Sequence, residues 1–151
     1  MNSISEVVRD PARRQRFIDG CCAVLDAEVE ARTGMSGRLV RLAYHQVGKL
    51  EGGRLIENVF DKLADEFAEE VDPVYQHWLR ETGGDEPFAA WVESHRDELV
   101  AALLRVTDRE RDRVGKPFLV MTYNRLRGLA ERLVGEAIPA VAALVEDHTA
   151  A

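Results

Sequence analysis

Apolar side chains recur every three or four residues along most of the chain, the spacing that places them on one face of an α-helix. The clearest stretch covers four turns, and its apolar positions are Ile56, Val59, Phe60, Leu63, Phe67 and Val71. No stretch alternates apolar and polar residues in the way a half-buried strand does. The pattern therefore predicts an all-α protein.

Prolines and glycines divide this pattern into separate segments. A carboxylate precedes proline at Asp10-Pro11, Asp72-Pro73 and Glu86-Pro87. Each pair is typical of a helix start, because the carboxylate accepts free backbone N–H groups and proline has none to lose. Ser36 and Ser94 are expected to cap two further helices, the second with Asp97 in a capping-box arrangement.

The segments predict a compact bundle of six or seven helices, in one domain over residues 1–151 with residues 1–8 as a loose N-terminal turn. The expected helices cover about 11–32, 36–50, 56–71, 74–83, 87–91, 94–113 and 117–145. Pro73 is expected to end or kink the third of them, and Pro139 to kink or divide the last. We expect the third and last helices to be central to the core.

Composition and charge narrow the classes of partner. The formal net charge of −7 disfavours a protein whose main partner is nucleic acid. No stretch approaches the roughly 20 apolar residues of a membrane helix, and the N-terminus lacks the apolar region of a secretory leader. We therefore expect no membrane partner and a cytoplasmic location. Cys21 and Cys22 are adjacent within an expected helix, where a disulfide would strain the backbone, so both are interpreted as reduced thiols.

Two pairs of side chains have the spacing of a metal or proton-relay site. His77 and Glu81 are four residues apart, and His95 and Glu98 are three apart, so each pair could share one helix face. Ordinary surface pairs explain the same spacing and are the favoured interpretation. We therefore expect no catalytic, cofactor-binding or metal-ligating residue.

An acidic cluster follows the strongest apolar stripe and consists of Asp61, Asp65, Glu66, Glu69, Glu70 and Asp72. Carboxylates in such numbers suit a hard cation. These residues, however, surround the apolar stripe from outside, whereas the carboxylates of di-iron bundles point inward. A solvated helix face is the favoured interpretation, and a metal site is the alternative.

The segment over residues 34–46 has the outline of a helix-turn-helix, with a tight glycine-containing turn before a second helix. It looks a little like the recognition helix of TetR-type repressors, in its Gly-hydrophobic-Ser start and its Tyr44-His45 pair. The resemblance implies contact with DNA through Arg38 and Arg41. A corner between two helices of the bundle explains the same residues and is the favoured interpretation.

Three aromatic side chains flank the Gly83-Gly84 turn: Trp78, Phe88 and Trp91. They could form an exposed patch for a partner, or line a pocket for a small apolar ligand between helices. They could equally close one end of the bundle, which is the favoured interpretation.

Taken end to end, the chain resembles a family of small uncharacterised proteins from actinobacteria. The resemblance rests on motifs at residues 8–14 (hydrophobic-x-Asp-Pro-x-Arg-Arg), 25–29 (Leu-Asp-x-Glu-Val), 34–37 (Gly-Met-Ser-Gly), 103–108, 126–128 and 138–139. It implies an all-helical domain and supplies no reaction, ligand or catalytic residue.

These observations favour a non-enzymatic cytoplasmic protein that acts through protein contacts, as a homodimer. Motifs of common enzymes are missing: there is no Gly-x-Ser-x-Gly elbow and no glycine-rich phosphate loop. A DNA-binding regulator and a binder of a small apolar ligand are the two alternatives.

Overall fold

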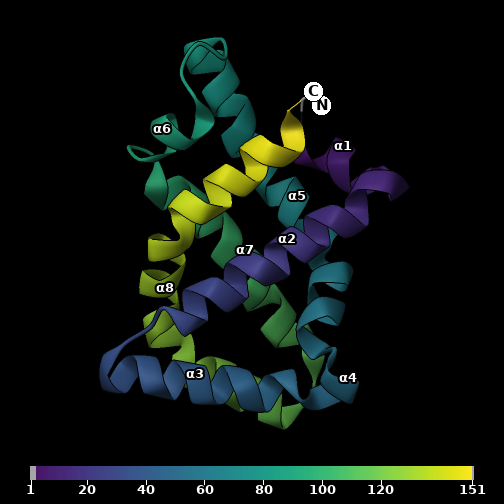
Figure 1. The fold of residues 1–151 in the computed structure, drawn as a ribbon, viewed down its shortest axis with the longest axis vertical. Helices are drawn as coiled ribbons and strands as arrows, with labels where there is room; N and C mark the ends of the chain where they lie inside the picture. The colour runs from purple at the N-terminus through teal and green to yellow at the C-terminus, as the bar shows by residue number, and fades with distance from the viewer. Residues whose placement is uncertain (1–2, 151) are drawn as a thin grey trace.

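The computed structural model describes residues 3–150, and within them it contains helices and no strand (Figure 1). The helices are α1 (Ile4–Arg9), α2 (Pro11–Glu30), α3 (Gly34–Gly48), α4 (Leu50–Gly53), α5 (Leu55–Thr82), α6 (Phe88–Val92), α7 (Arg96–Val114) and α8 (Pro117–Thr149). The predicted all-α bundle is therefore confirmed. Among residues 3–150 the structure has eight helices where seven segments were expected, because α1 and the single turn α4 are added and the expected helices 56–71 and 74–83 are joined in α5.

The core lies between α1, α2, α5, α6, α7 and α8, which all contribute buried apolar side chains to one cluster. Helix α5 supplies Ala68, Val71 and Val74, and the second half of α8 supplies Ile138 and Ala142. Helix α3 contributes no side chain to this cluster; it lies across the end of the molecule opposite the chain termini (Figure 1). Several helices therefore pack together at one end of the bundle, and the single helix α3 covers the other end.

Where a loose N-terminal turn was expected, the structure has the helix α1, which spans Ile4–Arg9. Ile4, Val7 and Val8 are buried in the core. Ser3 caps the helix, because its hydroxyl oxygen accepts the Glu6 backbone N–H at 3.1 Å. Burial of three apolar side chains outweighs the low intrinsic stability of so short a helix.

The three carboxylate–proline pairs differ in what they do. Asp10 caps α2 as predicted, since its Oδ1 accepts the Ala12 backbone N–H at 2.9 Å. Asp72-Pro73 starts no helix, because α5 runs through it without interruption. Glu86 does not cap α6 either; the Ala89 N–H is instead bound at 2.7 Å by the Glu146 carboxylate of α8.

Both prolines that were expected to interrupt helices lie inside continuous ones, Pro73 in α5 and Pro139 in α8. A proline inside a helix costs about 3 kcal/mol. On both sides of Pro73 the helix is held by buried Val71 and Val74. Packing of this kind keeps the helix continuous, although α8 changes direction along its length (Figure 1).

Two predicted serine caps are wrong. Helix α3 begins at Gly34 after Thr33, so Ser36 lies within its first turn. Helix α7 begins after His95, and the Ser94 hydroxyl donates backwards to the Trp91 carbonyl at 3.1 Å. This shift matters for the site below, because it places His95 at the exact junction between α6 and α7.

Candidate metal centre

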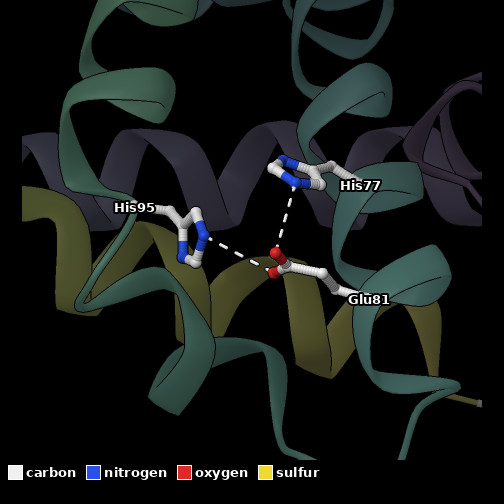
Figure 2. A group of neighbouring side chains, drawn as sticks. All are labelled: His77, Glu81 and His95. Atoms are coloured by element: carbon white, nitrogen blue, oxygen red, sulfur yellow. Dashed lines mark ion pairs between the residues drawn. The ribbon is translucent and has the colours of Figure 1, made fainter.

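The candidate site forms where α5 ends and the chain turns back. Gly83 terminates α5 in the left-handed conformation (φ 64°), and after a short connection α6 and α7 return alongside it. His77 and Glu81 lie one turn apart near the end of α5, and His95 is the residue before α7. Figure 2 shows the three side chains converging from the two sides of this turn.

The potential ligand atoms of these three residues all lie within 4.8 Å of one another. Glu81 is in the middle: its Oε1 is 3.8 Å from His77 Nε2, and its Oε2 is 3.5 Å from His95 Nε2. The side chains of His77 and His95 are 33% and 23% exposed, and that of Glu81 is 51% exposed. The centre is therefore open to an ion from solvent.

The other ring nitrogen of each histidine is bound by an acceptor. His77 Nδ1 lies 3.0 Å from Glu98 Oε1, and His95 Nδ1 lies 2.9 Å from the Trp91 carbonyl oxygen. Because a carboxylate and a carbonyl can only accept, each Nδ1 carries the hydrogen and donates it. In a neutral imidazole this leaves a lone pair on each Nε2, aimed at the centre.

Trp91 of α6 holds the three residues in place. Its indole N–H donates to Glu81 Oε2 at 2.5 Å. The His95 ring stacks on the indole with a centroid distance of 3.7 Å and an interplanar angle of 13°, and the His77 ring meets it edge-on at 5.0 Å. Since Trp91 is itself buried, with 3% of its surface exposed, the site stands on a rigid support.

The histidine pairs predicted from spacing are arranged differently in space. His77 does approach Glu81, but it makes its shorter contact with Glu98, which had been paired with His95. His95 instead reaches back to Glu81 across the turn. Spacing along one helix cannot reveal a partner on the next helix, so the joint site of three residues was missed.

The acidic cluster of α5 lies against cations of other helices. Glu70 binds Arg105 and Arg109 of α7, both at 2.9 Å, and Glu66 binds Arg113 at 2.7 Å. The hydrogen bond from Arg113 lowers the pKa of Glu66, and the one from Arg109 lowers that of Glu70. Asp61 and Asp65 contact Arg14 of α2. These carboxylates therefore join α5 to its neighbours.

The residues proposed for DNA contact differ in exposure. Arg38 is exposed on α3, whereas Arg41 is half-buried and donates to the Arg32 carbonyl. Contact of either with nucleic acid stays a prediction.

The predicted aromatic patch lies mostly inside the molecule. Phe88 and Trp91 are only 1% and 3% exposed, and Trp78 is partly buried, with its N–H donating to the Glu86 carbonyl at 2.7 Å. The three rings pack around one another and Tyr75. One of them, Trp91, supports the candidate site, and partner or ligand contact by the group stays a prediction.

Both cysteines are free thiols within α2. Burial raises the pKa of Cys21 to about 12, and it also raises that of Cys22. Raised values keep the thiols protonated and weak as nucleophiles or metal ligands. The candidate centre is therefore the histidine–glutamate group.

No helix among the described residues is long and apolar enough to cross a bilayer. Comparison with curated proteins and with solved structures finds no match to the chain. A family model does match, over residues 4–149, and it describes a family of unknown function. This confirms the resemblance to a small uncharacterised family, while its actinobacterial range stays a prediction. The chain belongs to the family of unknown function DUF6918.

Proposed function

We propose that the protein binds a divalent first-row transition metal ion through His77 Nε2, His95 Nε2 and the Glu81 carboxylate. The observation that carries the proposal is the convergence of these three electron-pair donors within 4.8 Å. Two imidazoles and one carboxylate form a donor set that suits Zn²⁺ and Fe²⁺ better than Mg²⁺ or Ca²⁺. Zn²⁺ is the ion on which the proposal is tested.

The distances are close to those that a bound ion requires. Two ligand atoms that each lie about 2.0–2.1 Å from a tetrahedral ion are about 3.4 Å apart. The separations of 3.5 and 3.8 Å from Glu81 to the two Nε2 atoms exceed this by a few tenths of an ångström. The third separation, between the two Nε2 atoms, is at most 4.8 Å, so we expect the ligands to move together by up to about 1 Å when an ion binds.

The contacts behind the ligands also favour a metal. Glu98 and the Trp91 carbonyl each accept a hydrogen bond from an Nδ1 atom, so both histidines present Nε2 with its lone pair forward. This carboxylate–histidine or carbonyl–histidine arrangement is the usual outer support of a metal ligand. Without a cation between them, two lone pairs and a carboxylate would repel one another.

Three protein ligands leave one or more coordination positions of the ion for water or another ligand. Because the Glu81 side chain is half exposed, we expect these positions to face solvent. The proposal is therefore a metal-binding helical protein, and it assigns no reaction.

The test is titration of metal-free protein with Zn²⁺ by calorimetry, together with Co²⁺ as an absorbing substitute. We expect one ion per chain, and an absorption spectrum of the Co²⁺ protein that is typical of nitrogen ligands. His95→Ala and Glu81→Gln should each weaken binding at least about tenfold, and Glu98→Gln, which alters only the outer contact, about 10- to 100-fold.

His45→Ala is the matched control, since His45 is an exposed histidine that contacts a single carboxylate, Glu30, at 3.0 Å. It should bind Zn²⁺ like the unaltered protein. Equal binding by His95→Ala and His45→Ala would contradict the proposal. It would favour the alternative in which protons occupy the centre and the histidines form ion pairs with Glu81 and Glu98.

The second candidate function is that the protein forms a homodimer in the cytoplasm and acts through contacts with other proteins. It is supported by large apolar side chains exposed on α3 and α8, among them Met35 and Met121. Sedimentation equilibrium tests the homodimer directly. A monomer at all concentrations would exclude it.

A further inference from the structure

The end of the molecule closed by α3 carries the large apolar side chains that the described residues leave exposed. On α3, Met35 is 91%, Leu39 40% and Leu42 56% exposed, and on the first turns of α8 Phe118 is 43% and Met121 55% exposed. Helix α3 lies across this end, and the first half of α8 contacts it (Figure 1). These five side chains and the cations among them are called the basic apolar face.

The two segments that form this face carry a charge opposite in sign to that of the whole chain. Between residues 31 and 50, and again between residues 115 and 130, the chain contains arginine and lysine but neither aspartate nor glutamate. The chain as a whole has a formal net charge of −7. The segments that expose these apolar side chains are therefore themselves cationic.

Some of these cations form ion pairs with carboxylates of the protein, and others do not. Arg32, Arg127 and Lys116 bind carboxylates of other helices, namely Glu136, Asp108 and Glu51. Arg38, Lys49 and Arg125 are exposed and form no ion pair with any residue between 3 and 150. The second group is therefore available to an anionic partner.

On α3 the two kinds of side chain follow helical spacing. Met35, Leu39 and Leu42 recur at intervals of four and three residues, and Arg38 and the C-cap Lys49 lie along one edge of that stripe. A helix with an apolar stripe flanked by cations is typical of one that lies flat in the headgroup region of a bilayer. We propose that the basic apolar face docks on the surface of an anionic lipid membrane.

Charge distinguishes this occupant from a second copy of the chain. A two-fold contact would place the face against itself and so bring the cations of one copy to the same interface as those of the other, which repel. Nucleic acid would satisfy the cations but would leave Met35 and Leu42 without an apolar environment. A membrane of anionic lipid satisfies both. No helix among the described residues could span a bilayer, and this contact needs none that does, because it lies on the bilayer surface.

The experiment is cosedimentation of the whole protein with vesicles of phosphatidylcholine alone, or of phosphatidylcholine with about one third phosphatidylglycerol. We expect binding to the anionic vesicles only, and weaker binding at high salt. Leu39→Ser/Leu42→Ser should reduce the partition coefficient at least about tenfold, and Arg38→Gln several-fold. Both variants alter exposed side chains, and unchanged melting temperatures would show that they fold.

Arg80→Gln is the matched control, because Arg80 is an exposed arginine in the last turn of α5, at the other end of the molecule. It should bind like the unaltered protein. The proposal is overturned if anionic vesicles do not bind the protein, or if the serine variant binds them equally well. It is also overturned if a dimer forms without lipid and the serine variant abolishes it, which would assign the face to a second copy.

Discussion

Asp72, in the middle of α5, caps a helix that lies 68 residues before it: its Oδ1 accepts the Ile4 backbone N–H at 2.7 Å. The same carboxylate accepts the Ser5 N–H at 3.3 Å and the Ser5 hydroxyl. Two of the backbone donors that every helix N-terminus leaves unpaired are thus satisfied by a distant side chain. Asp72 thereby links α1 to the core helix α5.

Replacing Asp72 should therefore cost more than loss of an ordinary cap. We expect Asp72→Ala to lower the free energy of unfolding by about 2–3 kcal/mol, because it leaves backbone N–H groups and a hydroxyl without their acceptor. Urea denaturation measures the change. Asp10→Ala is the control, since Asp10 caps α2 within its own turn and its loss should cost about 1 kcal/mol. Equal losses would contradict the linking role.

Alanine substitutions at Gly20 and Gly128 should have opposite effects on stability, because α2 and α8 approach each other closely at Gly20, whereas Gly128 has free space around it. A Cβ atom at Gly20 would lie 2.6 Å from Leu144 Cδ1 and 3.3 Å from His148 Nε2, whereas one at Gly128 would meet nothing within 4 Å. We expect Gly20→Ala to destabilise the protein by about 1 kcal/mol, since the end of the Leu144 side chain can shift but the buried His148 ring has less room to move. Gly128→Ala should stabilise it by about 0.4–1 kcal/mol. Thermal unfolding of the two variants tests the difference in sign.

His148, near the end of α8, should make stability depend on pH. Burial lowers the pKa of His148, and Arg16 and Arg13 lower it further against the opposing effect of Asp147. In the unfolded chain the group titrates at about pH 6.5. As pH falls through that value, the unfolded state binds a proton that the folded state rejects, so stability falls.

The measurement is the free energy of unfolding in urea at about pH 7.5 and about pH 5.5. The unaltered protein should lose more stability between these values than His148→Gln, in which this contribution is missing. The other histidines are present in both proteins, so the difference isolates His148. An identical pH dependence in the two would contradict the prediction.

The spacing of apolar residues was sufficient to predict the fold class, because a helix repeats its environment every three to four residues and the core of this protein follows that repeat. Ile18, Leu63 and Leu99, for example, all stand on expected stripes and are buried. Asp10-Pro11 was correctly identified as a helix start because its cap is local. Both successes concern interactions within a few residues.

The wrong serine caps at Ser36 and Ser94 are local errors in the position of a helix start, whereas the other failures concern interactions over long distances. Asp72 and Glu86 have the chemistry of local caps, yet one serves α1 and the other leaves α6 to Glu146. Likewise, His95 meets Glu81 only because the turn after Gly83 lays α6 and α7 back against α5. The helical period of a segment carries no information about which neighbouring helix it will face, so the candidate centre required the three-dimensional fold.

The long separation between Ile4 and Asp72 also bears on the order of events during synthesis of the chain. A helix of six residues is too short to persist alone in water. Its acceptor on α5 and much of its apolar contact come from segments that the ribosome makes later. Helix α1 leaves the ribosome before α5, yet it cannot become stable until α5 has formed. Its docking therefore follows the formation of α5.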